Sequence, residues 1–349
     1  MKIAVVPARA LTPEHCSHWE RIYLAEASLD SPFFSPELTR IVAGARDDVF
    51  VAVIDDGEHT GFFPFQRGRL ATGRPLGGPL CDYHGVVAPA GIQFDAVDLL
   101  RACGLRTWAF DGLPTSQEVF QRFCARTKLS YRIDLRAGFD SWAQERNASG
   151  SEQVLDAIAQ GRRLERDLGP VRFVAELRDP AAYATLQRWK SAQYERTGAI
   201  DVFRFAWVRR VLEAVRGSYT EPFAGMLSGL YVGDDLVAVH LGLRSRSVWH
   251  YWLPAYDPAR ARYSPGLVLL VEMARSAGEL GLEWIDLGKG EALYKSRLTH
   301  GGVVLAEGVA ASSAVLAAGR RVGTAVNAVL RRTPVGHRLD AARRRGRFA

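Results

Sequence analysis

The sequence has few cysteines, and their spacing offers neither a metal site nor a disulfide framework. Cys16, Cys81, Cys103 and Cys124 are the only four among 349 residues, and no two form a C-x-x-C pair. This usage argues against a zinc ribbon or a disulfide scaffold and suits a reducing compartment. We therefore expect a cytoplasmic protein with no metal.

Long hydrophobic runs and the common nucleotide-binding motifs are also missing. No run of about 18 apolar residues occurs, which is the length a spanning helix needs. The first residues contain no sustained apolar segment, so we expect no signal peptide. Neither G-x-x-x-x-G-K-[ST] nor a G-x-G-x-x-G after a strand occurs, which leaves P-loop and Rossmann folds unsupported.

What is present is a globular composition with an uneven distribution of charge. Hydrophobic residues make up 48% of the chain and charged residues 24%, with a net charge of +7. Residues 320–349 contain nine arginines and one aspartate, so the remaining chain is close to neutral and we expect no DNA binding. The length predicts two domains, at 1–140 and 151–308, joined by polar residues 136–150 and followed by a basic amphipathic tail at 309–349.

One stretch predicts a strand, a loop, a helix and a second, parallel strand. Val248–Leu253 and Glu283–Leu287 read as the strands, and Ser264 followed by Pro265 as the start of the helix, with Ser264 as its N-cap. A connection of this kind is a βαβ unit. The loop, Arg260–Leu267, is basic and leads into a helix N-terminus, so it is a candidate cradle for a phosphate or pyrophosphate; an ordinary capped helix is the alternative.

Elsewhere the pattern predicts two similar halves. A hairpin at Val49–Gln66 and another at Ala224–Leu243 are each followed by a helix that leads into a further strand. The segment Gln117–Thr127 reads as helical. The similar spacing of the halves is evidence for a tandem duplication.

Several short motifs occur in a fixed order along the chain: Ser31–Pro36, Cys81–Gly85, Trp189–Tyr194, Val237–Leu243, Tyr251–Asp257, Tyr263–Gly266, Ile285–Gly288 and Tyr294–Lys295. In this order they resemble the CelD/BcsL-like acetyltransferase family, which belongs to the GNAT superfamily and is related to FemAB-type transferases. The likeness extends over roughly residues 30–300.

The resemblance implies a mixed-sheet α/β fold of two tandem GNAT-like lobes, of which the C-terminal lobe carries the acyl-CoA site. It implies an acetyl-CoA-dependent N-acetyltransferase whose acceptor is an amino sugar, free or lipid-linked, in exopolysaccharide or cell-envelope polysaccharide synthesis. The expected cosubstrate-binding residues are Arg260, Arg262, Tyr263, Ser264, Pro265, Gly266 and Leu267.

Acetyl transfer needs a base for the acceptor amine and an acid for the leaving thiolate. Tyr294 is the candidate acid; His240 and Asp286 are alternative bases, although a structural role is open for each of the three. The candidate substrate-binding residues are Asp82, Tyr83, His84, Lys190, Tyr194, Tyr251 and Lys295.

Two other functions stay open. One is a FemAB-like aminoacyl transferase that uses aminoacyl-tRNA, although no long coiled-coil insertion occurs; the other is a degenerate acyltransferase serving as an adaptor in a glycan-synthesis complex. The basic tail is either a solvated terminus or a surface for anions, namely the inner face of the membrane or cyclic-di-GMP. The protein would then be cytoplasmic or peripheral at the inner membrane.

Overall fold

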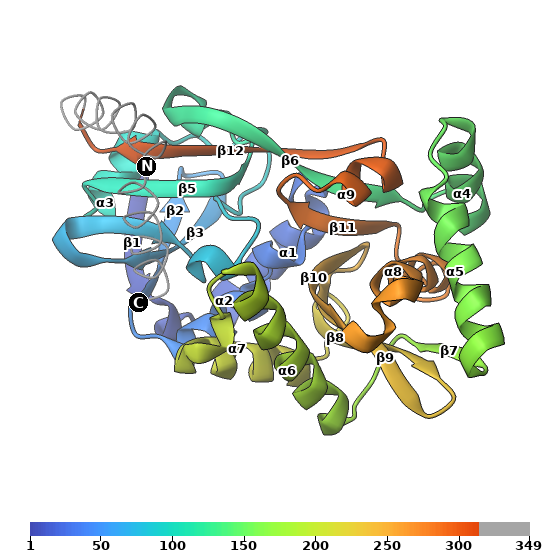
Figure 1. Cartoon of the computed structure of the whole chain (residues 1–349). Helices are drawn as coiled ribbons and strands as arrows, with labels where there is room; N and C mark the ends of the chain where they lie inside the picture. The colour runs from blue at the N-terminus through green and yellow to red at the C-terminus, as the bar shows by residue number, and fades with distance from the viewer. Residues whose placement is uncertain (314–349) are drawn as a thin grey trace, which may run out of the picture. The chain divides into compact units, whose positions relative to one another are not determined.

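The computed structural model describes residues 1–313, which fold into two compact units (Figure 1). The first unit contains residues 1–128 together with the strand residues from Val304 onward, and the second contains residues 129–303. Residues 136–150, expected to form a polar junction, instead contain a helix, α4 (Phe139–Ala148). The basic tail was predicted at 309–349; its first residues, 309–311, instead belong to a strand, and residues 314–349 lie outside the described residues.

The first unit has a mixed sheet in the order β1-β2-β3-β4-β5-β12. Two helices separate the first two strands, and a third helix connects β4 to the parallel strand β5. In chain order the elements are β1 (Lys2–Pro7), α1 (Pro13–Ala25), α2 (Pro36–Ala45), β2 (Val49–Asp55), β3 (Thr60–Arg67), β4 (Thr72–Pro75), α3 (Ala96–Ala102) and β5 (Thr107–Pro114).

The second unit repeats this order of elements, and its sheet runs β6-β11-β10-β9-β8-β7. After α4 and α5 (Gln153–Leu168), the elements are β7 (Val171–Val174), α6 (Pro180–Thr197), α7 (Ala206–Gly217), β8 (Ala224–Val232), β9 (Asp235–Arg244), β10 (Val248–Tyr256), α8 (Pro265–Ser276), β11 (Trp284–Lys289) and α9 (Leu293–Leu298). Strands β10 and β11 are parallel, as β4 and β5 are. The prediction of two similar halves in a mixed α/β fold is therefore confirmed.

Each sheet is completed by a strand that follows the fifth strand of the other unit. Strand β6 (Cys124–Asp134) comes after β5 but pairs with β11, whereas β12 (Gly301–Ala311) comes after β11 but pairs with β5. Both pairings are antiparallel. The two halves therefore exchange their last strands, which no local sequence pattern indicated.

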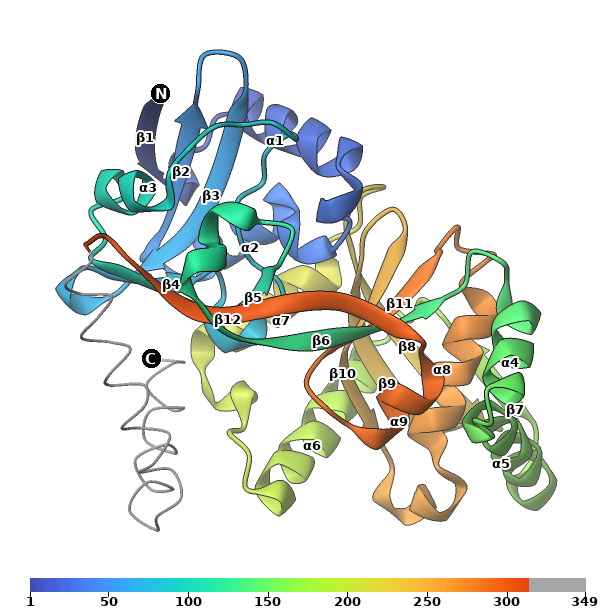
Figure 2. The ribbon, with the colours of Figure 1, turned by 90° about the horizontal axis from the view of Figure 1, so that it is seen from above.

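Helices cover both faces of strands β8–β10 in the second unit. Figure 2 shows α6 on one side of these strands and α8 on the other, with α5 packed beside α8. The core on the α8 side contains fully buried Trp249, Tyr263 and Leu269. The first unit has a separate core, in which Phe63, Trp108 and Phe120 are fully buried.

Proline marks the start of four of the helices. The first helical position is occupied by Pro13, Pro36, Pro180 and Pro265. A backbone N–H at this position would have no acceptor within the helix, so proline costs no hydrogen bond there. The helix predicted at Gln117–Thr127 was wrong. Only a 3₁₀ segment, Glu118–Phe123, forms there, because Cys124 already begins β6 and its backbone is committed to a sheet.

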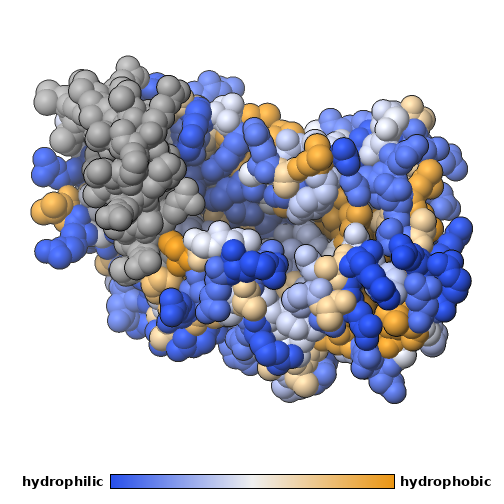
Figure 3. All heavy atoms as spheres, viewed as in Figure 1, coloured by the Kyte–Doolittle hydropathy of each residue, from blue (hydrophilic) through white to orange (hydrophobic). Residues whose placement is uncertain are grey.

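Hydrophilic side chains dominate the face shown in Figure 3, with hydrophobic ones in scattered patches. Among the large hydrophobic side chains, Leu155 and Leu293 are 46% and 67% exposed, respectively. Within residues 1–313 no helix has the length and apolar character needed to cross a membrane.

Candidate functional site

The sheet of the second unit opens between β10 and β11. These strands pair at Val248–Trp284, Trp249–Ile285 and His250–Asp286, and the pairing stops there although both strands continue. Beyond Asp286, β11 also leaves its regular register with β6. The two strands therefore separate beyond this point, and a parallel pair that separates exposes backbone N–H and C=O groups in the gap.

Asp286 lies at the point of separation and is fully buried. Its carboxylate accepts hydrogen bonds from Ser130 Oγ (2.7 Å), Arg132 Nε (2.9 Å) and the backbone N–H of Gly288 (2.8 Å). His250 Nδ1 is 3.5 Å away. A carboxylate held by an arginine and two further donors is stabilised in its charged form, so these contacts favour a structural role over that of a base.

His240, the other candidate base, is also fully buried, in β9. Its Nε2 accepts the backbone N–H of Trp252 at 3.1 Å, and its Nδ1 is 3.2 Å from Ser228 Oγ. Burial, with a smaller effect of His250, lowers the pKa of His240 to about 3. The ring is therefore neutral at pH 7 and its lone pair is in use, so these contacts argue against proton abstraction.

The loop before α8 has the features of an anion cradle. Ser264 has φ 48° and ψ 49°, a left-handed conformation that is uncommon outside glycine and clusters at functional sites. Its side chain does not cap the helix, contrary to the prediction; its carbonyl instead accepts the N–H groups of Leu267 and Val268. Space remains above Gly266, because a Cβ there would meet only Tyr256 Cδ1, at 3.4 Å.

Arginines surround this loop. Arg260 and Arg262 belong to the 3₁₀ segment Pro258–Tyr263, which packs against α5. Arg262 donates to the hydroxyl of Tyr263 (2.6 Å), and that hydroxyl donates to Asp167 of α5 (3.2 Å). Tyr263 is fully buried, so it holds the loop in place and cannot line it; Pro265 is buried as well. Positive charge and free helix-terminal N–H groups favour a phosphate here.

Tyr251 connects β10 to the start of α8, and a second tyrosine, Tyr294, lies near it. Tyr251 of β10 donates through its hydroxyl to the Gly266 carbonyl (3.3 Å), and burial raises its pKa, with a further contribution from nearby Tyr294. Tyr294 is half-buried in the first turn of α9, and burial raises its pKa as well. Both phenols therefore keep their protons at neutral pH, and Tyr294 is suited to donate one.

Lys190 of α6 is nine-tenths buried, which is rare for a lysine without a carboxylate partner. Its ammonium donates to the Pro254 carbonyl of β10 (2.9 Å) and lies 5.4 Å from the centre of the Tyr194 ring. Burial lowers the pKa of Lys190 to about 8. Burial and Asp201 raise that of Tyr194 to about 12.

The other predicted substrate-binding residues have structural contacts. Lys295 donates to the carbonyls of Gly288 (3.0 Å) and Lys289 (3.2 Å), where β11 ends. Asp82, Tyr83 and His84 belong to the first unit, where His84 Nε2 accepts the N–H groups of Asp111 and Gly112, both at 3.0 Å. A role for these four residues in substrate binding stays a prediction.

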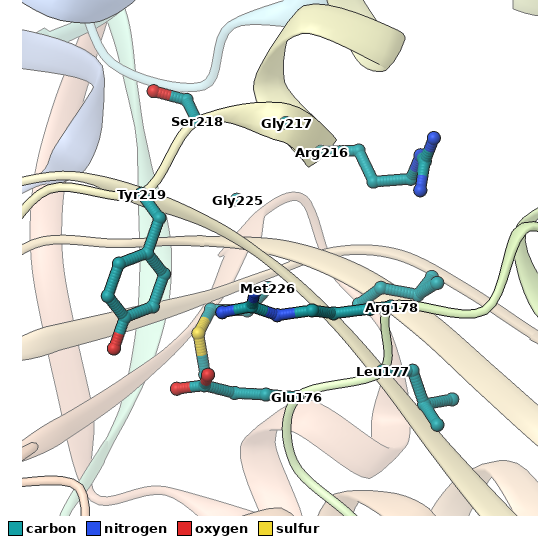
Figure 4. A pocket seen from close by; sticks show the side chains of 10 residues that line it. Glu176, Leu177, Arg178, Arg216, Gly217, Ser218, Tyr219, Gly225 and Met226 are labelled. Atoms are coloured by element: carbon teal, nitrogen blue, oxygen red, sulfur yellow. The ribbon is translucent and has the colours of Figure 1, made fainter.

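A separate pocket of about 260 Å³ lies in the second unit (Figure 4). It is lined by Glu176–Arg178, by the last residues of α7 and those that follow it, and by the start of β8. It therefore adjoins the end of the sheet where β10 begins. The cradle follows the other end of β10. None of the predicted site residues lines this pocket, and no cluster of potential metal ligands occurs in residues 1–313.

Three polar residues of the site were missed. Ser130 and Arg132 of β6 and Ser228 of β8 have side chains that contact Asp286 or His240. A signal was available, since a polar residue inside an apolar strand needs a buried partner. The identity of that partner, as much as 156 residues away for Ser130, was not readable from the sequence.

Most of the second unit matches a known family of domains. Residues 154–296, less than half of the chain, match the family described as acetyltransferase (GNAT) domain. That segment runs from α5 to α9 and includes the opening and the cradle. No curated protein matches the chain.

Solved structures resemble nearly the whole chain. The C-terminal domain of a putative lysylphosphatidylglycerol synthetase from Agrobacterium fabrum aligns with 90% of this chain and 96% of its own, at 14% identity and a TM-score of 0.56. A protein of unknown function from Bacteroides thetaiotaomicron aligns with 89% of this chain and 99% of its own, at 12% identity and a TM-score of 0.54. FemX aligns with 88% of this chain and 96% of its own, at 9% identity and a TM-score of 0.51. These identities show a shared fold alone. The GNAT level of the expected resemblance is thus supported, and the narrower CelD/BcsL family is not confirmed.

Proposed function

We propose that this protein is an N-acyltransferase that moves an acetyl group from acetyl-CoA to the amine of an amino sugar. The observation that carries the proposal is the opening between β10 and β11, next to the cradle at the start of α8. A GNAT-type domain fold and this pair of features together favour acyl transfer. The amino-sugar acceptor, and a role in polysaccharide synthesis, rest on the motif resemblance.

The cradle fits the diphosphate of coenzyme A. The Gly266 N–H, the dipole of α8 and the guanidinium groups of Arg260 and Arg262 would hold it, and the absence of a side chain at Gly266 allows close approach. The thioester supplies the activated acyl group. Backbone N–H groups exposed where β10 leaves β11 are suited to stabilise negative charge on the acyl oxygen.

Two side chains are suited to proton transfer. The phenol of Tyr294, protonated at neutral pH, can donate its proton to the leaving thiolate. The acceptor amine must lose a proton, and Lys190, with a pKa of about 8, is partly neutral near pH 7–8. We therefore place Lys190 ahead of His240 and Asp286 as the proton acceptor, since the lone pairs of those two are committed to buried hydrogen bonds.

Acetyl-CoA binding to the Gly266→Tyr variant tests the cradle. Gly266 has ordinary helical backbone angles and only Tyr256 nearby, so the variant should fold while its side chain fills the approach space. Gly278→Tyr, beyond the other end of α8 and in open space, is the matched control. Calorimetry should show affinity reduced at least about tenfold in the first variant, a change of 1.4 kcal/mol, and unchanged in the second. Equal affinities would refute the cradle.

The donor is tested by competition. Aminoacyl-tRNA is the donor in the alternative derived from the sequence, so charged tRNA and acetyl-CoA should be offered to the protein together with a panel of amino sugars. Acetylated product is the expected result. Transfer of an amino acid, with no competition by CoA, would reverse the assignment.

A further inference from the structure

Strand β10 has an irregularity that is bridged by a side chain of the neighbouring strand. Between His250, which pairs with Leu243, and Leu253, which pairs with Leu241, two residues of β10 oppose the single residue Gly242. Such a bulge takes a residue out of the backbone ladder. The Trp252 N–H, in this bulge, donates to His240 Nε2 (3.1 Å).

The contacts of His240 determine where its proton lies. A backbone N–H always donates, so Nε2 must be the unprotonated nitrogen and Nδ1 carries the proton toward Ser228 Oγ (3.2 Å). The ring is fully buried, which favours this neutral form. A single tautomer thus joins β8 to the bulge of β10 through a side chain of β9.

The residues around the ring accommodate it closely. A Cβ at Gly242 would lie 2.4 Å from His240 Cε1, so the absence of a side chain at that position makes room for the imidazole. The ring stacks on Tyr251, with centres 4.7 Å apart and planes at 25°. Tyr251 in turn donates to the Gly266 carbonyl in the first turn of α8 (3.3 Å). A continuous chain of contacts therefore runs from Ser228 to the cradle.

We infer that His240 is a positioning residue: its imidazole takes the place of a ladder acceptor for Trp252 and fixes the bulge of β10 that presents the edge of this strand to the acyl group. The link to the acyl group rests on the proposed function. The support of the bulge does not, because it follows from the contacts of Ser228, His240 and Trp252 alone. His240 acts through β10 and takes no proton from the substrate.

The test compares His240→Gln with His240→Leu in the full-length protein. Glutamine offers an acceptor oxygen at the end of a side chain of similar reach, whereas leucine fills the space without an acceptor. Hydrogen exchange of the peptide that covers residues 248–256 reports on the bulge directly. We expect exchange to be faster by about tenfold or more in His240→Leu, the size of effect that one lost buried hydrogen bond produces, and close to wild type in His240→Gln. Ser228→Ala, a milder change, should give an intermediate rate.

Kinetics then connect the bulge to catalysis. His240→Leu should lower kcat about tenfold or more while the dissociation constant of acetyl-CoA stays within about twofold, and His240→Gln should recover most of kcat. Equal exchange rates in wild type and His240→Leu would overturn the inference, and so would a glutamine variant that behaves like the leucine variant. A wild-type protein without transferase activity would refute the proposed function, and the exchange comparison would still decide the role of His240.

Discussion

Replacing Lys190 with methionine should make the folded protein more stable and lower its catalytic activity. Burial shifts the pKa of Lys190 from its ordinary 10.5 to about 8, which corresponds to a cost of about 3 kcal/mol for keeping the side chain charged in the folded state. Methionine removes this cost but also the hydrogen bond to the Pro254 carbonyl, a loss of about 1–2 kcal/mol. The net expectation at pH 7 is a variant about 1–2 kcal/mol more stable than wild type.

The sign of the pH dependence is fixed by the direction of this shift. Between the folded pKa of about 8 and the unfolded value of 10.5, the unfolded chain binds more protons, so the stability of the wild type rises with pH there. Below pH 8 the full cost is present. The stability advantage of Lys190→Met should therefore shrink by about 2 kcal/mol between pH 7 and pH 9.5.

Urea unfolding of wild type and variant at the two pH values measures this change. Arg188→Met is the matched control, because Arg188 is an exposed cation on the same helix, and within residues 1–313 its one side-chain hydrogen bond is to Thr185 Oγ1, at 3.1 Å. Its difference from wild type should not depend on pH. A stability difference for Lys190→Met that is the same at both values would refute the reasoning from burial.

The activity of the same variant tests the proposed proton transfer. If Lys190 accepts the proton of the acceptor amine, kcat/KM of the wild type should rise with pH through about 8 and then level off. The reason is that only the neutral form of the Lys190 side chain can accept a proton. Lys190→Met should lose this limb and most of the rate while binding acetyl-CoA normally. An unchanged profile would assign the proton to another acceptor.

Three further outcomes follow from individual contacts. Asp286→Asn should lower the free energy of unfolding by about 3–5 kcal/mol, because it takes the charge away from buried Arg132; replacing both residues with apolar ones should restore much of the stability in the same urea assay. Gly225→Ala should cost at least about 1–3 kcal/mol in thermal unfolding, since the new Cβ would lie 2.0 Å from the Val215 carbonyl oxygen, and a neutral result would mean that α7 moves freely. Tyr294→Phe should lower kcat and leave acetyl-CoA binding intact in steady-state assays; an unchanged kcat would remove the phenol from the mechanism.

Local features of the sequence were sufficient to predict most of the elements. Pro180 and Gly198 bracket α6 (Pro180–Thr197), as a proline at the first helical position and a glycine just past the last one do. The parallel arrangement of the strands that flank Pro265 was predicted as well and is confirmed. These features depend on neighbours within a few residues, so their physical causes are present in the sequence as written.

The sequence predicted where the loop before α8 lies, but it did not predict correctly what each of its residues does. The sequence singled out Arg260–Leu267 as a candidate cradle from its charge, Ser264–Pro265 and Gly266, because helix termini have local signals. The structure starts α8 at Pro265, and anion binding at this loop stays a prediction. The side chain of Ser264 was expected to cap α8, but the residue adopts a left-handed conformation and its carbonyl accepts instead. Either the hydroxyl or the carbonyl oxygen of Ser264 could accept the N–H groups at the start of α8. The path of the loop against α5, a tertiary contact, decides which of them does.

The sequence by itself determined most of the helices, the hairpins, the duplicated order of elements and the start of α8, since each depends on periodicity or on turn residues. Only the tertiary structure decided that β6 and β12 are exchanged between the sheets. It also decided that His240 is joined to Trp252, and Asp286 to Arg132, by buried hydrogen bonds. The physical reason is that a polar side chain in a strand must find a partner once buried. For Asp286 the fold alone brings that partner, Arg132, from 154 residues away to 2.9 Å.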